Sequence, residues 1–188
     1  PEEYIEGDEK AADADSGGWP QSGRNRALRI MRKAFAPHVT GDQHLGSTIQ
    51  YGIDEFGDGP FAFVVPSVAN LWPRRWYPPE AGENLEPGAP RYAGEHFDGF
   101  GNRMTVHAVA NPVQSGAVPS ALYDRVPGYG IIRFDKLSRN IVFEAWPRWV
   151  DPSSLDARQF YGWPVTFNQF DNYGGEVGYL PMLEIFGL

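Results

Sequence analysis

Asp42 and His44 are the two residues of this sequence best suited to bind a metal ion. They are two positions apart in the run Gly41-Asp42-Gln43-His44, in which the glycine lets the backbone turn sharply. A carboxylate and an imidazole held close together suit zinc, iron or manganese. The same residues also allow a structural interpretation, in which Asp42 caps the following turn and His44 is an ordinary surface or core histidine. For an isolated motif of this kind, the structural interpretation is the commoner one.

Three arginines could bind a phosphate group beside such a metal. Arg24 belongs to a basic stretch, and Arg74 and Arg75 are adjacent in a segment rich in proline and aromatic residues. A guanidinium group can donate two parallel hydrogen bonds to phosphate oxygens, so arginine is favoured where phosphate is recognised. Each of these arginines, taken singly, is more often a solvated surface residue.

The remaining histidines, His38, His96 and His107, are weaker ligand candidates. His107 lies in a strand pattern and is expected to occupy one face of a sheet. His38 follows the helix-ending residue Pro37 and is expected to interact with the end of that helix.

A helix followed by a short strand is predicted to position the loop over Gly41 to His44. Ser22 is a suitable N-cap for a helix over about Gly23 to Ala36, which Pro37 ends. The buried stripe of this helix is predicted at Leu28, Met31 and Phe35. His38 to Thr40 is predicted to be the short strand, and a loop at the carboxyl end of such a strand is where α/β proteins usually bind ligands.

Short strands are predicted in the rest of the chain, because 22 glycines and 17 prolines interrupt it too often for long helices. Tyr129 to Asp135 and Ile141 to Trp146 are expected to form a hairpin. Phe61 to Val65 is expected to be a buried strand, and Ser47 to Ile53 either a strand or a helical turn. Pro66 to Arg91 is predicted to be a long irregular excursion, and long ordered loops are usually functional. Further strands are predicted at Met104 to Ala110, Val165 to Asn168 and Met182 to Phe186.

Composition limits the classes of function. The net charge of −8 argues against a general nucleic-acid binder, which needs an excess of clustered lysine and arginine. The absence of cysteine means that any metal must bind to His, Asp, Glu or Asn. No apolar stretch is long enough to be a transmembrane helix, and the acidic residues 1–18 are expected to form an extended arm.

A longer stretch of the sequence resembles the end of the alkaline phosphatase D domain. It runs from Asp15-Ser16-Gly17-Gly18-Trp19 through Arg24 and the predicted helix to His38-Val39-Thr40-Gly41-Asp42-Gln43-His44-Leu45. In that family, an Asp/Trp/Gly-aromatic stretch with a following arginine precedes a helix and then a strand that ends in Gly-Asp-x-His. A less characterised subgroup of the family resembles this chain from Asp15 almost to Leu188. The further similar segments are Pro73 to Trp76, Gly128-Tyr129-Gly130, Phe143 to Trp149 and Gly162-Trp163-Pro164.

The resemblance implies a fold, an activity and a location. The fold is α/β and β-rich: residues 19–188 would form the carboxy-terminal half of a calcineurin-like metallophosphoesterase, a two-sheet sandwich with few helices. The activity is that of a metal-dependent phosphoric ester hydrolase, either a phosphatase or a phosphodiesterase, in which two metals activate a bridging water for in-line attack on phosphorus. The metals would be divalent or trivalent ions such as Fe, Ca, Zn or Mn. An extracytoplasmic location, periplasmic or secreted, is also implied.

The resemblance also assigns roles to residues of this chain. His44 would be a metal ligand, and Asp42 would be a second ligand or a catalytic residue that orients the imidazole. Arg24 would be a catalytic residue. The residues expected to bind the phosphate ester are Trp19, Arg74 and Arg75.

The chain is expected to supply only part of this active site. The superfamily's earlier ligands come from D-x-H, G-D-x-x-D and G-N-H motifs, and an ordered set of these is absent here. The chain begins with Pro1, so we expect an upstream amino-terminal segment, or a second chain, to complete the site, and the chain alone to be inactive. A homo-oligomer is left open. If Asp42-Gln43-His44 were instead the first D-x-H, Gly57 to Phe61 would lack the second aspartate and Gly101-Asn102-Arg103 would have arginine in place of histidine.

Two other classes of function stay open. A carbohydrate-binding module would expose a row of tryptophans to the faces of sugars, although aromatic residues more commonly fill cores. The tryptophans near prolines that could form such a row are Trp72, Trp76, Trp146, Trp149 and Trp163. A non-catalytic structural protein would assemble with itself by pairing exposed strand edges, without metal.

Overall fold

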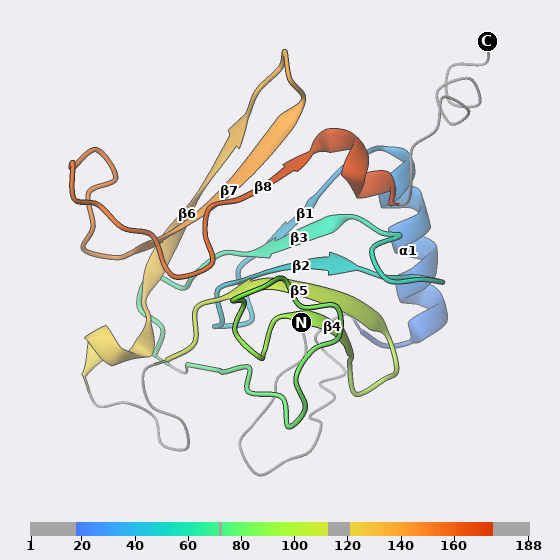
Figure 1. The fold of residues 1–188 in the computed structure, drawn as a ribbon, viewed down its shortest axis with the longest axis horizontal. Coiled ribbons are helices and arrows are strands. Elements are labelled where there is room, and N and C mark those ends of the chain that lie inside the picture. The colour runs from blue at the N-terminus through green and yellow to red at the C-terminus, as the bar shows by residue number, and fades with distance from the viewer. Residues whose placement is uncertain (1–17, 72, 113–120, 175–188) are drawn as a thin grey trace.

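The structure is a computed structural model that describes residues 18–71, 73–112 and 121–174. Within these ranges, eight strands form two β-sheets and one α-helix lies beside them (Figure 1). The predicted β-rich fold with few helices is therefore confirmed. Almost all of the predicted arm, residues 1–17, and the predicted strand Met182 to Phe186 lie outside the described residues. No helix in the described part of the chain has the length and apolar character needed to cross a membrane.

The larger sheet has the strand order β1-β3-β2-β5-β4. β1 and β3 run parallel, and the other neighbouring strands run antiparallel. Ser47 to Ile53 was expected to be either a strand or a helical turn, and it contains the strand β2. The bounds of the five strands are β1 (His38–Thr40), β2 (Ser47–Tyr51), β3 (Phe61–Val64), β4 (Gly94–Phe97) and β5 (Arg103–Val109).

The smaller sheet is an antiparallel meander in the order β6-β7-β8. β6 (Gly128–Phe134) and β7 (Asn140–Pro147) form the predicted hairpin, with Tyr129 opposite Trp146. β8 (Val165–Asn168) has the predicted bounds. The 3-10 helices η2 (Leu122–Arg125) and η3 (Gln169–Tyr173) precede β6 and follow β8.

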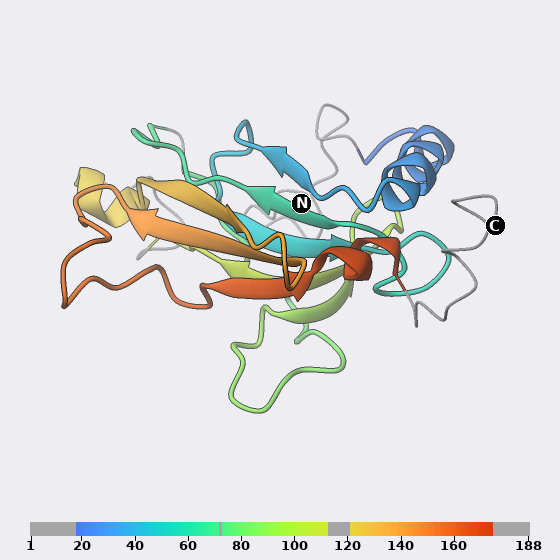
Figure 2. The ribbon, with the colours of Figure 1, turned by 90° about the horizontal axis from the view of Figure 1, so that it is seen from above.

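The two sheets pack face to face through aromatic rings (Figure 2). Phe63 of β3 stacks on Phe143 of β7 with ring centroids 4.9 Å apart, and Phe61 stacks on Phe167 of β8 at 4.0 Å. Since side chains alternate along a strand, Ala62 between the two phenylalanines faces the opposite side of the larger sheet. That side carries a second apolar cluster, which includes Leu45, Ile49, Trp76, Met104 and Val106.

Helix α1 (Gln21–Lys33) lies at the end of the larger sheet where β2 leads into β3 (Figure 1). Ion pairs tie it to the β2–β3 connection, with Arg29 Nη2 2.9 Å from Asp54 Oδ1 and Arg32 Nη1 3.8 Å from Asp58 Oδ2. These contacts fix the helix at one end of the sheet, and the loop over Gly41 to His44 belongs to the other end.

The predicted start and end of this helix were wrong. The helix begins at Gln21 with Pro20 as its N-cap, so Ser22 lies inside the first turn and caps nothing. Proline suits this boundary because its fixed φ and missing N–H cost nothing there. Leu28 is buried as expected, but the helix ends at Lys33. Phe35 therefore lies beyond it, at a φ of 51°, and packs edge-on against Phe170 at 5.2 Å.

A β-bulge in β5 lies at His107, and the side chain of this residue is in the core between the sheets. Ile49 of β2 pairs with Val106 and Thr48 pairs with Ala108, which leaves His107 as the extra residue. The imidazole stacks on Phe61 with centroids 5.1 Å apart. Its Nε2 is fully buried and has no hydrogen-bond partner among the described residues. Burial lowers the pKa of His107 from 6.5 to about 4.

This histidine should make the protein less stable in acid. Between pH 6.5 and about 4, the unfolded chain binds a proton at His107 and the folded chain does not, so the free energy of unfolding falls with pH. At about 1.4 kcal/mol for each pKa unit, the loss approaches about 3 kcal/mol. Urea unfolding of the wild type and of His107→Gln at pH 7 and pH 4 measures it. Because the carboxylates are common to both proteins, equal losses in the two would contradict the assignment.

Candidate functional site

The Gly41 to His44 loop follows β1 at the end of the sheet remote from α1. Its backbone is held on two sides: Val65 N–H donates to Thr40 O at 2.8 Å, and Ala110 N–H donates to Gly46 O at 2.8 Å. β3 and β5 therefore position the loop together.

The three side chains of this loop differ in exposure. Asp42 is exposed, Gln43 is buried and His44 is half buried. His44 also has a φ of 54°, in the left-handed region that residues other than glycine seldom adopt. Such backbone strain clusters at functional sites and motivates a functional hypothesis for the residue that carries it.

Arg74 joins this loop from the irregular segment that follows β3. Its Nη1 donates to Gln43 Oε1 at 3.2 Å, and its backbone N–H is 3.4 Å from His44 O. Partial burial lowers the pKa of the Arg74 guanidinium, which nevertheless stays charged at neutral pH. Arg75 is buried at 8% exposure. The structure thus brings Arg74 to the loop that carries Asp42 and His44, although Arg74 follows His44 by 30 positions in the sequence.

Arg24 lies at the opposite end of the larger sheet. Its Nη1 donates to Gly52 O at 2.8 Å and its Nη2 to Arg103 O at 3.3 Å, and its guanidinium lies over the Tyr51 ring. Gly52 follows the end of β2, whereas the His44 loop adjoins the start of β2. At about 3.3 Å per residue, five residues of strand separate the two places by roughly 16 Å. Arg24 ties α1 to the sheet and does not meet the His44 loop.

Trp19 belongs to the same remote end. Its ring is 59% exposed and lies 5.5 Å from the Phe100 ring, in the turn between β4 and β5. The preceding residue, Gly18, accepts a hydrogen bond of 3.0 Å from Asn102 Nδ2. The predicted site residues therefore divide between two ends of the sheet.

The other histidines do not join the His44 loop. His38 lies in β1, and its Nδ1 is 3.0 Å from the Tyr51 hydroxyl, so the predicted interaction with the end of the helix was wrong. Burial lowers the pKa of His38 and raises that of the Tyr51 phenol to about 12. His96 Nε2 is 3.1 Å from Ala93 O.

Asp42 and His44 have no third ligand beside them within the described residues. No group of three or more His, Cys, Asp or Glu side chains in ranges 18–71, 73–112 and 121–174 could hold a metal ion together. The two residues fit a metal by donor type, since a carboxylate oxygen and an imidazole nitrogen bind Zn, Fe or Mn. A complete metal site would need ligands from beyond the described part.

A cavity of about 900 Å³ lies at this same end of the molecule, and sequence reasoning did not predict it. The loop over residues 148–161 after β7, the end of β5 and Tyr77 of the irregular segment line it. One signal was present in the sequence: residues 148–164 connect β7 to β8, and a connection of that length is often functional.

The row of exposed tryptophans expected of a carbohydrate-binding module is not found in the described residues. Trp76, Trp146 and Trp163 are buried in the apolar clusters or beside them, and Trp72 lies outside the described residues. Trp163 Nε1 donates to Thr48 Oγ1 at 3.0 Å, which satisfies its polar group inside the core. Of the five, Trp149 is half exposed.

No family model, curated protein or solved structure matches this chain.

Proposed function

We propose that this chain is the carboxy-terminal part of a metal-dependent phosphoric ester hydrolase with a calcineurin-like sandwich, similar to the alkaline phosphatase D family. The observation that carries the proposal is the position of the Gly41 to His44 loop, which follows a strand parallel to β3 and lies against Arg74. Ligands of α/β sheets bind outside the carboxyl ends of strands. A potential metal ligand, His44, and a cation that could bind phosphate, Arg74, meet at that place.

The residues at this end of the sheet would have different roles in the reaction. His44, with Asp42 as a second ligand or as the group that orients the imidazole, would hold a metal ion. Metal ions, when bound, supply a water nucleophile of lowered pKa and stabilise charge on the phosphate. Arg74, which is only partly buried, would bind a phosphate oxygen through its guanidinium. Arg75 is more deeply buried, so we assign it to holding the segment in place.

Arg24 and Trp19 are not part of this proposed site. Arg24 donates to two backbone carbonyls at the other end of the sheet, and Trp19 lies beside Phe100 there. We propose a structural role for Arg24. Its guanidinium donates hydrogen bonds to three residues and lies over the Tyr51 ring, so it is fixed where it cannot contact a substrate at the His44 loop.

The remaining ligands would come from a strand added to β1. β1 is the end strand of the larger sheet in the described residues, and its central residue Val39 is 46% exposed. An edge strand presents unpaired N–H and C=O groups that can pair with another strand. An upstream segment, or a second chain, that pairs there would bring its own strand ends next to the His44 loop. Export belongs to the same proposal and rests on the family resemblance.

Chelation tests the proposal directly. We expect a longer polypeptide that contains this chain to hydrolyse p-nitrophenyl phosphate or bis(p-nitrophenyl) phosphate, and to lose that activity in EDTA because the metal ions supply the nucleophile. Dialysis followed by addition of Fe, Ca, Zn or Mn should restore it. Residues 1–188 alone should show no turnover. Activity that survives exhaustive chelation would refute the metal-dependent mechanism, and hydrolysis by residues 1–188 alone would show that the metal motif is misplaced.

A further inference from the structure

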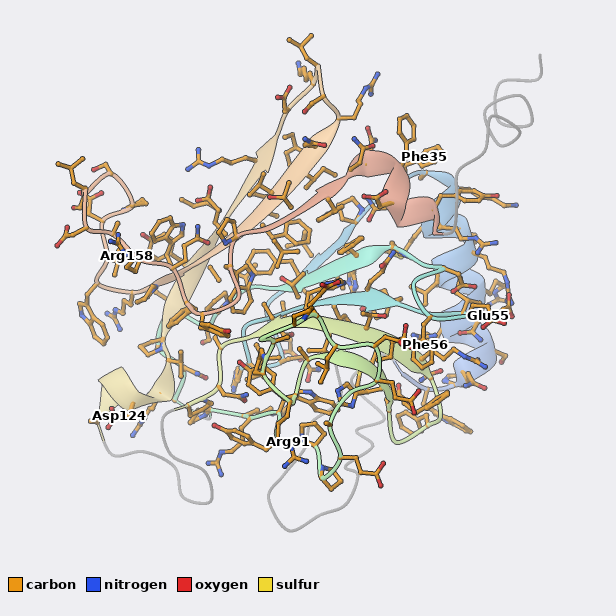
Figure 3. All side chains as sticks on the ribbon, in the orientation of Figure 1. Phe35, Glu55, Phe56, Arg91, Asp124 and Arg158 are labelled. Carbon is orange, nitrogen blue, oxygen red and sulfur yellow. The ribbon has the colours of Figure 1, made fainter. Side chains whose placement is uncertain are left out.

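The cavity beside β7 has the size of a small-molecule site. At about 900 Å³ it falls within the range of about 300–1,000 Å³ typical of ligand pockets. Figure 3 shows Arg158, one of its lining residues, on the loop at the side of the molecule opposite Glu55 and Phe56. Because the long loop, the end of β5 and the irregular segment all contribute to it, three separate parts of the chain shape one concave surface.

Aromatic side chains that stay exposed gather around this cavity. Trp149 is 49% exposed, Tyr161 is 68% exposed and Tyr77 is 37% exposed, and all three line it. Single exposed aromatic residues are ordinary, but a group of them around one hollow marks a binding surface. Arg148 lies with its guanidinium 5.8 Å from the Trp149 ring centroid, which helps to fix the indole. A rigid ring of this kind can support a flat apolar face of a ligand.

Phenol groups converge in the same cavity. Burial raises the pKa of the Tyr92 phenol, and the nearby phenols of Tyr161 and Tyr77 raise it further. The three hydroxyl groups are therefore close enough to interact electrostatically. The Tyr77 hydroxyl donates to Pro112 O at 3.2 Å, so its position is fixed. Hydroxyl groups both donate and accept hydrogen bonds, which suits a ligand that carries several hydroxyls of its own.

The charges that line the cavity disfavour an anionic ligand. Among the described residues that line it, the charged side chains are Asp151, Asp156 and Arg158. Hydrogen bonds from Ser153 N–H at 2.9 Å and from Ser153 Oγ at 2.7 Å lower the pKa of Asp151, which is therefore ionised at neutral pH. Arg158 Nη1 already donates to Ala157 O at 2.8 Å. A phosphate or carboxylate would meet more negative than positive charge here.

From these features we propose that the cavity binds a neutral hexopyranose unit of an oligosaccharide. The apolar C–H face of the sugar ring would lie on Trp149 and Tyr161. The sugar hydroxyls would donate to Asp156 and exchange hydrogen bonds with the Tyr92 phenol. This site lies apart from the Asp42–His44 pair and does not depend on the proposed hydrolase activity, because it uses neither of those residues.

Saturation-transfer difference NMR on residues 1–188 tests this binding with three neutral disaccharides, cellobiose, maltose and lactose. We expect saturable transfer to the ring C–H protons of at least one of them. Trp149→Ala and Tyr161→Ala should each weaken that binding by about tenfold or more, since each removes a stacking surface. Leu155→Ala is the matched control, because Leu155 is on the same loop, is fully exposed and does not line the cavity.

Three results would overturn the proposal. The first is the absence of saturable transfer from any of the three disaccharides. The second is binding that Trp149→Ala, Tyr161→Ala and Leu155→Ala affect equally. The third is displacement of the sugar by choline or a tighter affinity for glucose 6-phosphate than for glucose, because these would define a cation site and an anion site respectively. None of the readouts uses catalysis, so failure here leaves the hydrolase proposal standing, and the reverse holds as well.

Discussion

Replacing His44 by glycine in the complete hydrolase is expected to reduce metal-dependent phosphate ester hydrolysis by more than about 100-fold. Loss of a residue that merely supports a metal ligand typically costs about 10- to 100-fold, so loss of the ligand itself should cost more. Glycine is the informative replacement because His44 has a φ of 54°, which glycine adopts without strain. Any loss then belongs to the missing imidazole. Initial rates of p-nitrophenyl phosphate hydrolysis at saturating metal measure it.

Free imidazole and a second histidine provide the controls. Imidazole added to His44→Gly should restore part of the activity, because it can occupy the space of the missing ring and bind the same ion. His96→Gln should keep the wild-type rate, since His96 lies in β4 and its Nε2 contacts Ala93 O. An unchanged rate in His44→Gly would remove His44 from the metal site, whatever the chelator does.

The strands predicted best from the sequence are those whose residue patterns lie within the strand and its adjoining turns. Phe61 to Val64 is a short apolar run between prolines and glycines, and the hairpin of β6 and β7 has aromatic and β-branched runs on both sides of one turn. β2 comes directly before β3 in the sequence and pairs with it, and β6 pairs with β7 across one turn. Pattern reasoning succeeds in such cases because nothing distant has to be known.

The features that the sequence did not predict depend on pairing with other strands. β4, Gly94–Phe97, is short and polar, and it is a strand because it pairs with β5. The bulge at His107 is set by the register of β2 against β5, and no residue in β5 is of a type that predicts a bulge. The alternation expected from Met104 to Ala110 therefore breaks in the middle. His107 lies on one face of the sheet as expected, and that face is the one packed in the core, where the imidazole stacks on Phe61.

The candidate site was also predicted from the sequence only in part. Asp42 and His44 were placed correctly at the end of β1, because their loop follows directly from the short strand. Arg24 and Arg74 could not be separated by sequence, since the sequence does not show which groups either guanidinium contacts. The path of β2 decides between them: the His44 loop adjoins the start of β2, and Gly52, to which Arg24 donates, follows its end. Arg74, far away in sequence, is the residue that reaches the loop.

The two proposed sites both adjoin one packed layer between the sheets. β3 borders the Arg74 segment and carries Phe63, while β7 leads into the cavity loop and carries Phe143. Both proposed sites are therefore positioned by the contact between these two rings. A residue in that layer should matter for stability far more than any residue in either site.

Phe143→Ala should lower the free energy of unfolding by about 3–5 kcal/mol. The Phe143 side chain is fully buried, stacks on Phe63 at 4.9 Å and meets Phe167 edge-on at 5.0 Å. Alanine would leave a cavity that two facing sheets cannot close, so the protein loses both the buried area and the ring contacts. Urea unfolding followed by circular dichroism gives the value. Phe134→Ala makes the same change at a ring that is 65% exposed and should cost less than about 1 kcal/mol. Similar losses in the two variants would mean that the sheets do not pack through Phe143.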